Sequence, residues 1–354
     1  MKDYWNRTRE ELLAYAGSIE QIAPVRRFSF IEGRAKAVEA IEVQTGSGLA
    51  LTFLVDRALD LFDMRWRGRS LAWHSAAGVV SPVFYERKGP GWLRGFGGGM
   101  VVTCGLRNVG PGLEEGWETF GLHGEVSYTP ASGVQVDTAW ENGRYRIAVS
   151  GRIREGYPFG PNLLLRRTWR TEIGADWVEL EDVVTNEGFR PETHMQLYHC
   201  NFGYPLLNEN TRLYLSTDSV APRDEAAAPG IERWSEFEAP QDEFAEQVFF
   251  HSFTGSPPAI ASALVVHGEN ADFAARLSWP AAELPYLVQW KLCRKGDYVL
   301  GIEPANCLVE GREWHRRENR PTLAPGASVR MHLRLEVLAS TEAVTKAVAE
   351  MQHA

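Results

Sequence analysis

Two residues that lie far apart in the sequence are the first candidates for chemistry. His199 follows an alternating segment, residues 195–198, and precedes a turn rich in Asn, Gly and Pro. Glu303 closes an apolar segment at residues 298–302. Burial raises the pKa of a carboxyl group, which makes Glu303 a better base near neutrality, and histidine titrates near that range by itself. The two side chains therefore predict an acid and a base that face one small molecule.

Two further residues are candidates for binding that molecule. His123 lies between glycines in residues 121–125, where the backbone can approach a ligand closely. Arg107 ends a glycine-hinged strand, residues 97–108, and its planar guanidinium suits hydroxyls or a carboxylate. The alternatives are a turn histidine bonded to the backbone and an arginine in a structural ion pair.

A third polar pair lies on one face of the predicted strand 286–291. Gln289 and Lys291 share that face beside Trp290, and they are predicted to line a sugar pocket, with a solvated face as the alternative. His194 lies an odd number of residues before His199. It therefore falls on the opposite face of its strand and is not paired with it.

Composition excludes several classes of function. The chain has 354 residues and a formal net charge of −9, which argues against nucleic acid or an anionic membrane as a partner. The N-terminus has no apolar signal region and no apolar stretch is long enough to span a bilayer, so a cytoplasmic protein is expected. The cysteines form no CxxC pair and are expected to be free thiols: Cys104, Cys200, Cys293 and Cys307.

The motifs of nucleotide, nucleophile and metal sites are missing from the sequence. It contains no P-loop, no dinucleotide-binding glycine motif and no GxSxG elbow. His123, His199 and Glu303 offer two nitrogens and an oxygen, but these three residues do not stand at HxH or HxxE spacing. Neither a metal nor an organic cofactor is predicted.

The periodicity of the chain indicates a β protein with helices at its ends. Residues 144–149 and 329–337 alternate between apolar and polar side chains, as half-buried antiparallel strands do. Thr8 begins a capping box and Ser340 can cap a second helix. We predict one domain with a helical extension at 1–25, a large antiparallel β-sandwich at 26–339 and a helix at 340–354.

Two segments break the period-two pattern. Residues 89–99 hold six glycines around Trp92 and Phe96, and residues 218–247 are acidic and rich in Pro and Ala. Both are predicted to be long loops, which are often functional in compact domains.

An ordered set of segments resembles the aldose 1-epimerase (galactose mutarotase-like) superfamily, in its less characterised mutarotase-like branch. The resemblance covers roughly residues 25–340. The segments that carry it are Val55–Asp60, Arg107–Asn108, Leu122–Gly124, His199–Phe202 and Gly301–Pro304.

This resemblance implies a sugar bound in a groove on one sheet. Glu303 would take the proton of the C1 hydroxyl, and His199 would protonate the ring oxygen. His123 and Arg107 would hold the sugar, which makes a small-molecule sugar the expected partner. The order Arg107–Asn108 reverses the family's Asn-Arg, so Arg57 is a second candidate for the substrate arginine.

The function predicted from the sequence is a carbohydrate mutarotase or epimerase, an isomerase that needs no cofactor. The alternatives are a metal-dependent, cupin-like sugar isomerase and a non-catalytic sugar-binding module. A homodimer is left open.

Overall fold

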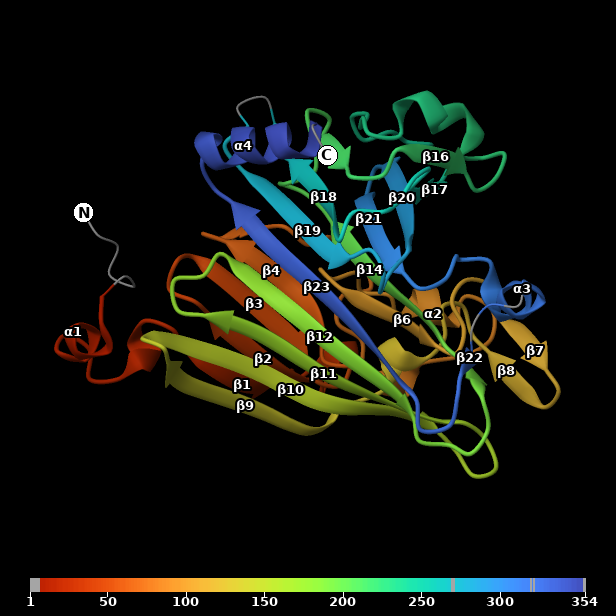
Figure 1. The fold of residues 1–354 in the computed structure, drawn as a ribbon, viewed down its shortest axis with the longest axis horizontal. Coiled ribbons are helices and arrows are strands. Elements are labelled where there is room, and N and C mark those ends of the chain that lie inside the picture. Colours follow the sequence, from red (N-terminus) through yellow and green to blue (C-terminus); the bar gives the residue numbers. More distant parts are fainter. Residues whose placement is uncertain (1–6, 269–270, 319, 321, 353–354) are drawn as a thin grey trace.

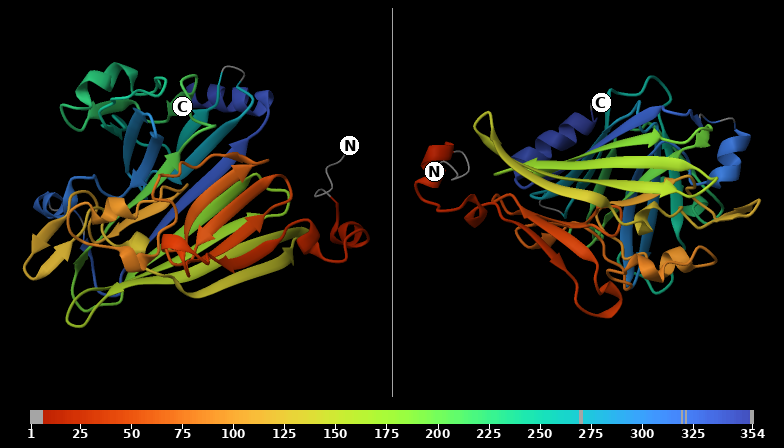
Figure 2. Two further views of the ribbon diagram at one scale, coloured as in Figure 1. Left: turned by 180° about the vertical axis from the view of Figure 1, so that it is seen from behind. Right: turned by 90° about the horizontal axis from the view of Figure 1, so that it is seen from below.

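Three antiparallel sheets surround one large apolar core in the computed structural model, which describes residues 7–268, 271–318, 320 and 322–352 (Figures 1 and 2). The predicted antiparallel β-sandwich is confirmed. Every pairing between named strands is antiparallel, and alternate residues are buried in long strands such as Trp177–Asn186 and Ser328–Leu338.

The largest sheet forms the outer layer of the sandwich. Its eight strands run in the order β15 (Arg212–Leu215), β18 (Ile260–Val266), β19 (Ala274–Pro280), β23 (Ser328–Leu338), β12 (Trp177–Asn186), β11 (Asn162–Glu172), β10 (Arg144–Gly156) and β9 (Ser132–Glu141).

A six-stranded sheet carries the candidate chemical residues. Its order is β16 (Ser219–Pro222), β17 (Gln247–Ser252), β20 (Tyr286–Arg294), β21 (Asp297–Ala305), β14 (Met195–Phe202) and β6 (Val102–Leu106). One face of this sheet packs on the main core, and the other packs on a second apolar cluster that includes Trp92, Phe96 and Val288.

The third sheet and two short ribbons complete the β structure. The five-stranded sheet contains β1 (Val25–Ser29), β2 (Glu39–Gln44), β3 (Leu49–Leu54), β4 (Asp60–Trp66) and β5 (Arg69–Ser70). The ribbons pair β7 (Leu113–Glu115) with β8 (Glu118–Phe120), and β13 (Glu192–Thr193) with β22 (Thr322–Leu323).

Helices are short and lie at both ends and in two loops. They are α1 (Arg9–Leu13), α2 (Gly91–Arg94), α3 (Gly311–Arg317) and α4 (Thr341–Gln352), with 3₁₀ turns at Ile19–Gln21, Gly33–Ala35, Pro82–Phe84, Val126–Tyr128 and Ala228–Arg233. No described helix has both the length and the apolar character needed to cross a bilayer.

Both predicted helix caps are confirmed. Thr8 Oγ1 accepts from the Glu11 N–H at 3.2 Å, the Glu11 carboxylate accepts from the Thr8 N–H, and Ser340 Oγ accepts from the Ala343 N–H. The prediction missed α2 and α3, which are each shorter than the sequence window in which helical periodicity can be recognised.

A buried ionic network ties the sheets together. Arg167 on β11 is fully buried and donates to both carboxylate oxygens of Asp182 on β12, at 2.9 and 2.6 Å. It also donates to Asp60 on β4 and to the hydroxyl of Thr103 on β6. Tyr198 on β14 donates to Asp182 at 2.7 Å. These contacts link all three sheets behind the candidate site.

Replacement of Arg167 by Met is expected to lower the free energy of unfolding by about 3–5 kcal/mol. Its loss leaves Asp60 and Asp182 as buried charges without their cation. Arg170→Met is the matched control, because Arg170 pairs with Glu181 at the surface and should cost less than about 1 kcal/mol. Urea unfolding of both variants measures the difference, and equal costs would contradict the role of the network.

Candidate functional site

His199 and Glu303 meet on the face of the six-stranded sheet that points away from the main core. The register of β14 and β21 pairs Leu197 with Ala305 and Cys200 with Ile302, which places His199 directly opposite Glu303. His199 Nε2 lies 3.2 Å from Glu303 Oε1, and the two residues are 6% and 2% exposed. The sequence therefore identified two residues that the fold brings into contact.

A glycine leaves room for this pair. Gly301 lies two residues before Glu303 on β21 and shares its face of the strand. A Cβ atom at Gly301 would lie 2.6 Å from Glu303 Oε1 and 3.4 Å from the His199 ring. Any larger residue at this position would displace the carboxylate.

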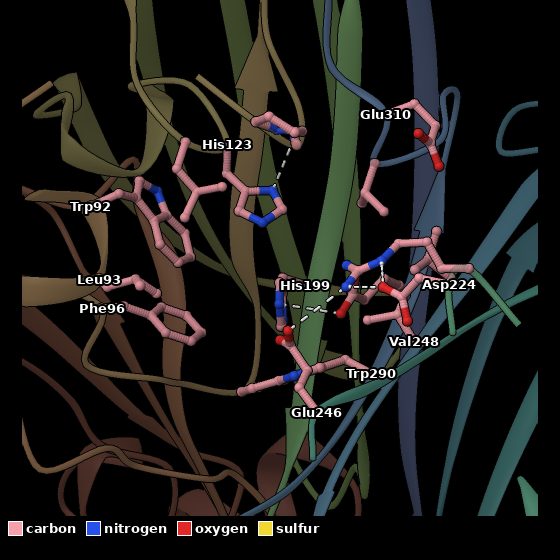
Figure 3. A pocket seen from close by; sticks show the side chains of 17 residues that line it. Trp92, Leu93, Phe96, His123, His199, Asp224, Glu246, Val248, Trp290 and Glu310 are labelled. Carbon is pink, nitrogen blue, oxygen red and sulfur yellow. Dashed lines mark hydrogen bonds and ion pairs between the residues drawn. The ribbon is translucent and has the colours of Figure 1, made fainter. Parts of the chain in front are cut away.

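The pair lies at the base of a cavity of about 540 Å³. Figure 3 shows Trp92 and Phe96 on one side of His199 and Asp224 on the other. The cavity is lined by Trp92, Leu93, Phe96, Gly110, Pro111, Leu122, His123, His199, Arg223, Asp224, Glu246, Val248, Val288, Trp290, Glu303, Val309 and Glu310. Apolar walls with a few convergent polar groups are typical of small-molecule sites.

Burial controls the protonation of the pair. It raises the pKa of Glu303 well above its usual range, with a smaller contribution in the same direction from the Glu246 carboxylate, whereas the Arg223 guanidinium lowers it. Burial also lowers the pKa of His199 to about 3, with help from His123, while Asn201 acts in the opposite direction. Burial therefore favours the neutral forms of both side chains, a protonated Glu303 and an unprotonated His199 ring.

Aromatic rings surround His199 and exclude water from it. Its ring centroid lies 5.3 Å from that of Trp290, 5.4 Å from that of Phe96 and 6.0 Å from that of His123. His199 Nδ1 and Glu303 Oε1 have no hydrogen-bond partner among the residues that the structure describes. The pair is thus desolvated and retains hydrogen-bonding capacity for a ligand.

His123 reaches the same cavity from a separate loop. Its Nδ1 accepts a hydrogen bond from the Gly110 N–H at 3.4 Å, so the proton of the neutral ring is on Nε2. Burial lowers the pKa of His123 to about 4, and the Arg223 guanidinium contributes in the same direction. His123 is therefore neutral at pH 7 and offers an Nε2–H donor.

The loop between β16 and β17 supplies polar groups that we did not single out from the sequence. Arg223 and Asp224 at its start and Glu246 at its end line the cavity. Arg223 Nε donates to Asp224 at 2.8 Å, and its Nη2 lies 3.8 Å from Glu246. The only signal was the break in periodicity at residues 218–247, part of which forms β16 and a 3₁₀ turn. The glycine-rich segment at 89–99 also lines the cavity, through Trp92 and Phe96.

The two arginines proposed for substrate binding lie elsewhere. Arg107 forms ion pairs with Glu118, Glu155 and Glu192 and faces a separate surface groove. Arg57 donates to three backbone carbonyls, of Ser127, Val80 and Gly95. Neither arginine lines the cavity. The guanidinium of each is bound by these ion pairs or hydrogen bonds, which hold loops together elsewhere in the fold. The ion-pair alternative therefore describes Arg107.

Gln289 and Lys291 do not line this cavity either, which corrects the expectation for β20. Strand alternation places Val288 and Trp290 in the cavity wall and sends Gln289 and Lys291 to the opposite face. There Gln289 Nε2 donates to the Trp234 carbonyl at 2.7 Å, and Lys291 Nζ donates to the Arg233 carbonyl at 3.1 Å. Both residues are fully buried, and they anchor the loop that carries Arg223 and Glu246 into the cavity wall.

Cys200 lies beside His199 in sequence but faces the main core. It is fully buried, and burial raises the pKa of its thiol well above the usual range, so a thiolate is disfavoured.

Cys200→Ser is expected to retain most of the activity proposed below, measured as anomer exchange per folded molecule. A loss of about a thousandfold with an intact fold would contradict this expectation. The four cysteines are free and buried.

No group of three or more His, Cys, Asp or Glu side chains converges closely enough to hold a metal ion in the described part of the chain. His123 and His199 face the same cavity with Glu303, but His123 Nδ1 is taken by the Gly110 N–H.

Comparison with known families gives one match. Residues 35–337 match the model of a family described as "Domain of unknown function (DUF4432)". The chain belongs to this family. No curated protein matches the DUF4432 chain.

Several solved structures with the same fold carry names that refer to sugar chemistry. A "putative aldose 1-epimerase" from Klebsiella pneumoniae superposes with a TM-score of 0.87 at 27% identity, over 93% of this chain and 87% of the other. A galactose 1-epimerase from Lactobacillus acidophilus has a TM-score of 0.57 at 15% identity, over 88% and 98%. A galactose mutarotase-like protein from Clostridium acetobutylicum has a TM-score of 0.57 at 11% identity, over 90% and 99%. The chain therefore has the galactose mutarotase-like fold, as its sequence motifs indicated.

Proposed function

We propose that this DUF4432 protein interconverts the anomers of an aldose or a related sugar by acid–base ring opening. The observation that carries the proposal is the contact of His199 Nε2 with Glu303 Oε1, 3.2 Å apart, at the base of a desolvated cavity. The names of the structural neighbours support the same class of reaction.

The proposed reaction moves protons and breaks one C–O bond. Glu303 takes the proton of the C1 hydroxyl while His199 gives a proton to the ring oxygen. The bond between C1 and the ring oxygen breaks, and C1 becomes the aldehyde carbon of an open chain. Rotation about C1–C2 presents the other face of the aldehyde, and closure returns both protons. Nothing is oxidised or reduced, so the pair alone completes the cycle.

The proposed roles need a different protonation of the pair from the one that burial favours. Burial favours a protonated Glu303 and a neutral His199, whereas the proposed roles need the proton on His199. A sugar hydroxyl that donates to Glu303 Oε1 stabilises the carboxylate, because hydrogen bonds to the charged form lower the pKa of a carboxyl group. Substrate binding is therefore part of how the base is activated.

The remaining cavity groups are suited to hold the sugar. His123 offers an Nε2–H donor, and Asp224 and Glu246 offer acceptors for hydroxyl groups. Arg223 takes the place that we had assigned to Arg57 or Arg107, because it is the arginine in the cavity wall. Trp92 and Trp290 supply flat apolar surfaces for the ring carbons.

Anomer exchange measured by saturation-transfer NMR over a panel of aldoses and uronates tests the proposal. Exchange faster than the uncatalysed rate for at least one sugar is expected. Binding without faster exchange would favour a sugar-binding module. Near-stoichiometric zinc or manganese in the purified protein, with activity lost on chelation, would favour a metal-dependent isomerase.

A further inference from the structure

We propose that Asn108 is a positioning residue that assembles the cavity wall carrying His123 and fixes the tautomer of its ring. This inference rests on the proposed function for its kinetic effect, but its structural part can be tested without any sugar. The geometry that carries it is the set of hydrogen bonds made by one buried amide.

Asn108 uses both functions of its amide. The residue is fully buried. Its Nδ2 donates to the Pro111 carbonyl at 3.0 Å and to the Gly121 carbonyl at 2.9 Å, and its Oδ1 accepts from the Arg312 N–H at 3.0 Å. Two donors and an acceptor on one short side chain are available only from an asparagine.

The three segments that Asn108 joins are the same segments that form one wall of the cavity. Gly110 and Pro111 precede the β7–β8 ribbon, Leu122 and His123 follow it, and Val309 and Glu310 lie immediately before α3. The third segment comes from a distant part of the chain. Asn108 therefore fastens a separate loop to the two loops that flank His123, beside a backbone bond from the Gly311 N–H to the Val109 carbonyl at 3.0 Å.

His123 depends on this wall because its backbone is strained. Its φ is +55°, in the left-handed region that a residue with a side chain adopts at a cost. Its N–H donates to the Gly110 carbonyl at 2.9 Å, its carbonyl accepts from the Gly105 N–H at 2.9 Å, and its Nδ1 accepts from the Gly110 N–H. Asn108 holds Pro111, and hence Gly110, and so controls which ring nitrogen of His123 carries the proton.

The adjacent arginine has a different role. Arg107 points to the outer groove, while its carbonyl accepts from Arg312 Nη1 at 3.0 Å. Arg107 and Asn108 therefore both contact Arg312, but only the Asn108 side chain reaches the loops that carry His123. The Arg-Asn motif serves the cavity through its asparagine and not through its arginine.

Asn108→Asp is the decisive variant, because it keeps the shape and removes both donors. Asn186→Asp is the matched control. Asn186 is 1% exposed and makes the same pattern of bonds away from the cavity, donating to the Arg190 and Leu323 carbonyls and accepting from the Gly188 N–H. Both variants lose the same kind of contacts, so a purely structural effect should be equal in the two.

The readouts are the ¹⁵N NMR signals of the His123 ring and the kinetics of anomer exchange. We expect Asn108→Asp to lose the predominant Nε2–H tautomer and about 10²-fold in turnover, since small misplacements at a site cost about that much. Asn186→Asp should change neither. If the parent exchanges no sugar, the proposed function fails, but the tautomer measurement still tests Asn108.

Two results would overturn the inference. One is an Asn108→Asp protein whose His123 tautomer and turnover match those of the control. The other is a failure of Asn108→Asp, Asn108→Ser and Asn108→Ala all to fold while Asn186→Asp folds, which would make Asn108 a determinant of folding only. If Asn108→Asp alone does not fold, the Ser and Ala variants are judged by the same two readouts.

Discussion

Glu303→Gln should lower the turnover of anomer exchange by about 10²–10⁴-fold, the contribution that a general base makes in enzymes. Glutamine keeps the length and shape of glutamate but cannot accept the proton of the C1 hydroxyl. The residue is 2% exposed and its carboxylate lies against His199, so a side chain of equal size should leave the cavity intact. Sugar affinity should change little, because the lost interaction acts in the transition state.

Saturation-transfer NMR measures the turnover, and titration calorimetry measures the affinity. Glu310→Gln is the comparison, since Glu310 also lines the cavity but has no contact with His199 among those that the structure records. It should lose less than about tenfold. Equal turnover in Glu303→Gln and the parent protein would show that Glu303 is not the base.

His199→Asn should cost a similar factor of about 10²–10⁴ in turnover and should also change the shape of the pH profile. In the parent the pair must hold one proton. Its rate therefore falls at low pH, where a second proton binds, and at high pH, where the last one leaves. Because burial lowers the pKa of His199 to about 3, the acid limb should lie below the range of an ordinary histidine.

Without His199 both limbs of the pH profile are expected to change. Glu303 alone must be deprotonated to act as a base, and its pKa is raised by burial. The residual rate of His199→Asn should thus increase with pH through that raised pKa and show no fall at high pH. His194→Asn is the control, because His194 is equally buried but bonds to Gln196 and Asn306. A bell-shaped profile that survives in His199→Asn would refute the assignment of the acid.

Local patterns in the sequence were enough to predict much of the fold. Alternation of apolar and polar residues predicted β10 and β23. Successive side chains of a strand point to opposite faces, so a strand with one buried face alternates apolar and polar residues. Thr8 and Ser340 predicted the ends of α1 and α4, because caps act within one turn of the chain. The short helices α2 and α3 have no side-chain cap and therefore give no such signal.

The sequence by itself also identified His199, Glu303 and His123 as the residues whose chemistry needed an explanation. Titratable groups in apolar or glycine-rich segments are unusual enough to be recognised before their neighbours are known. That His199 lies opposite Glu303 follows from the register of β14 and β21, which is set by the packing of both strands on the core.

Only the tertiary structure decided which polar residues face the cavity. Arg107, Gln289 and Lys291 have suitable chemistry, yet each is bound to partners far away in sequence, and Arg223 and Glu246 enter from a loop without periodicity. The physical reason is that side chains alternate between the two faces of every strand. The sequence pattern is therefore the same whether a given face lines a ligand cavity or packs against a loop. The sequence determined the polar and titratable side chains and their alternation along each strand. The pairing of distant segments determined which face of each strand became part of the site.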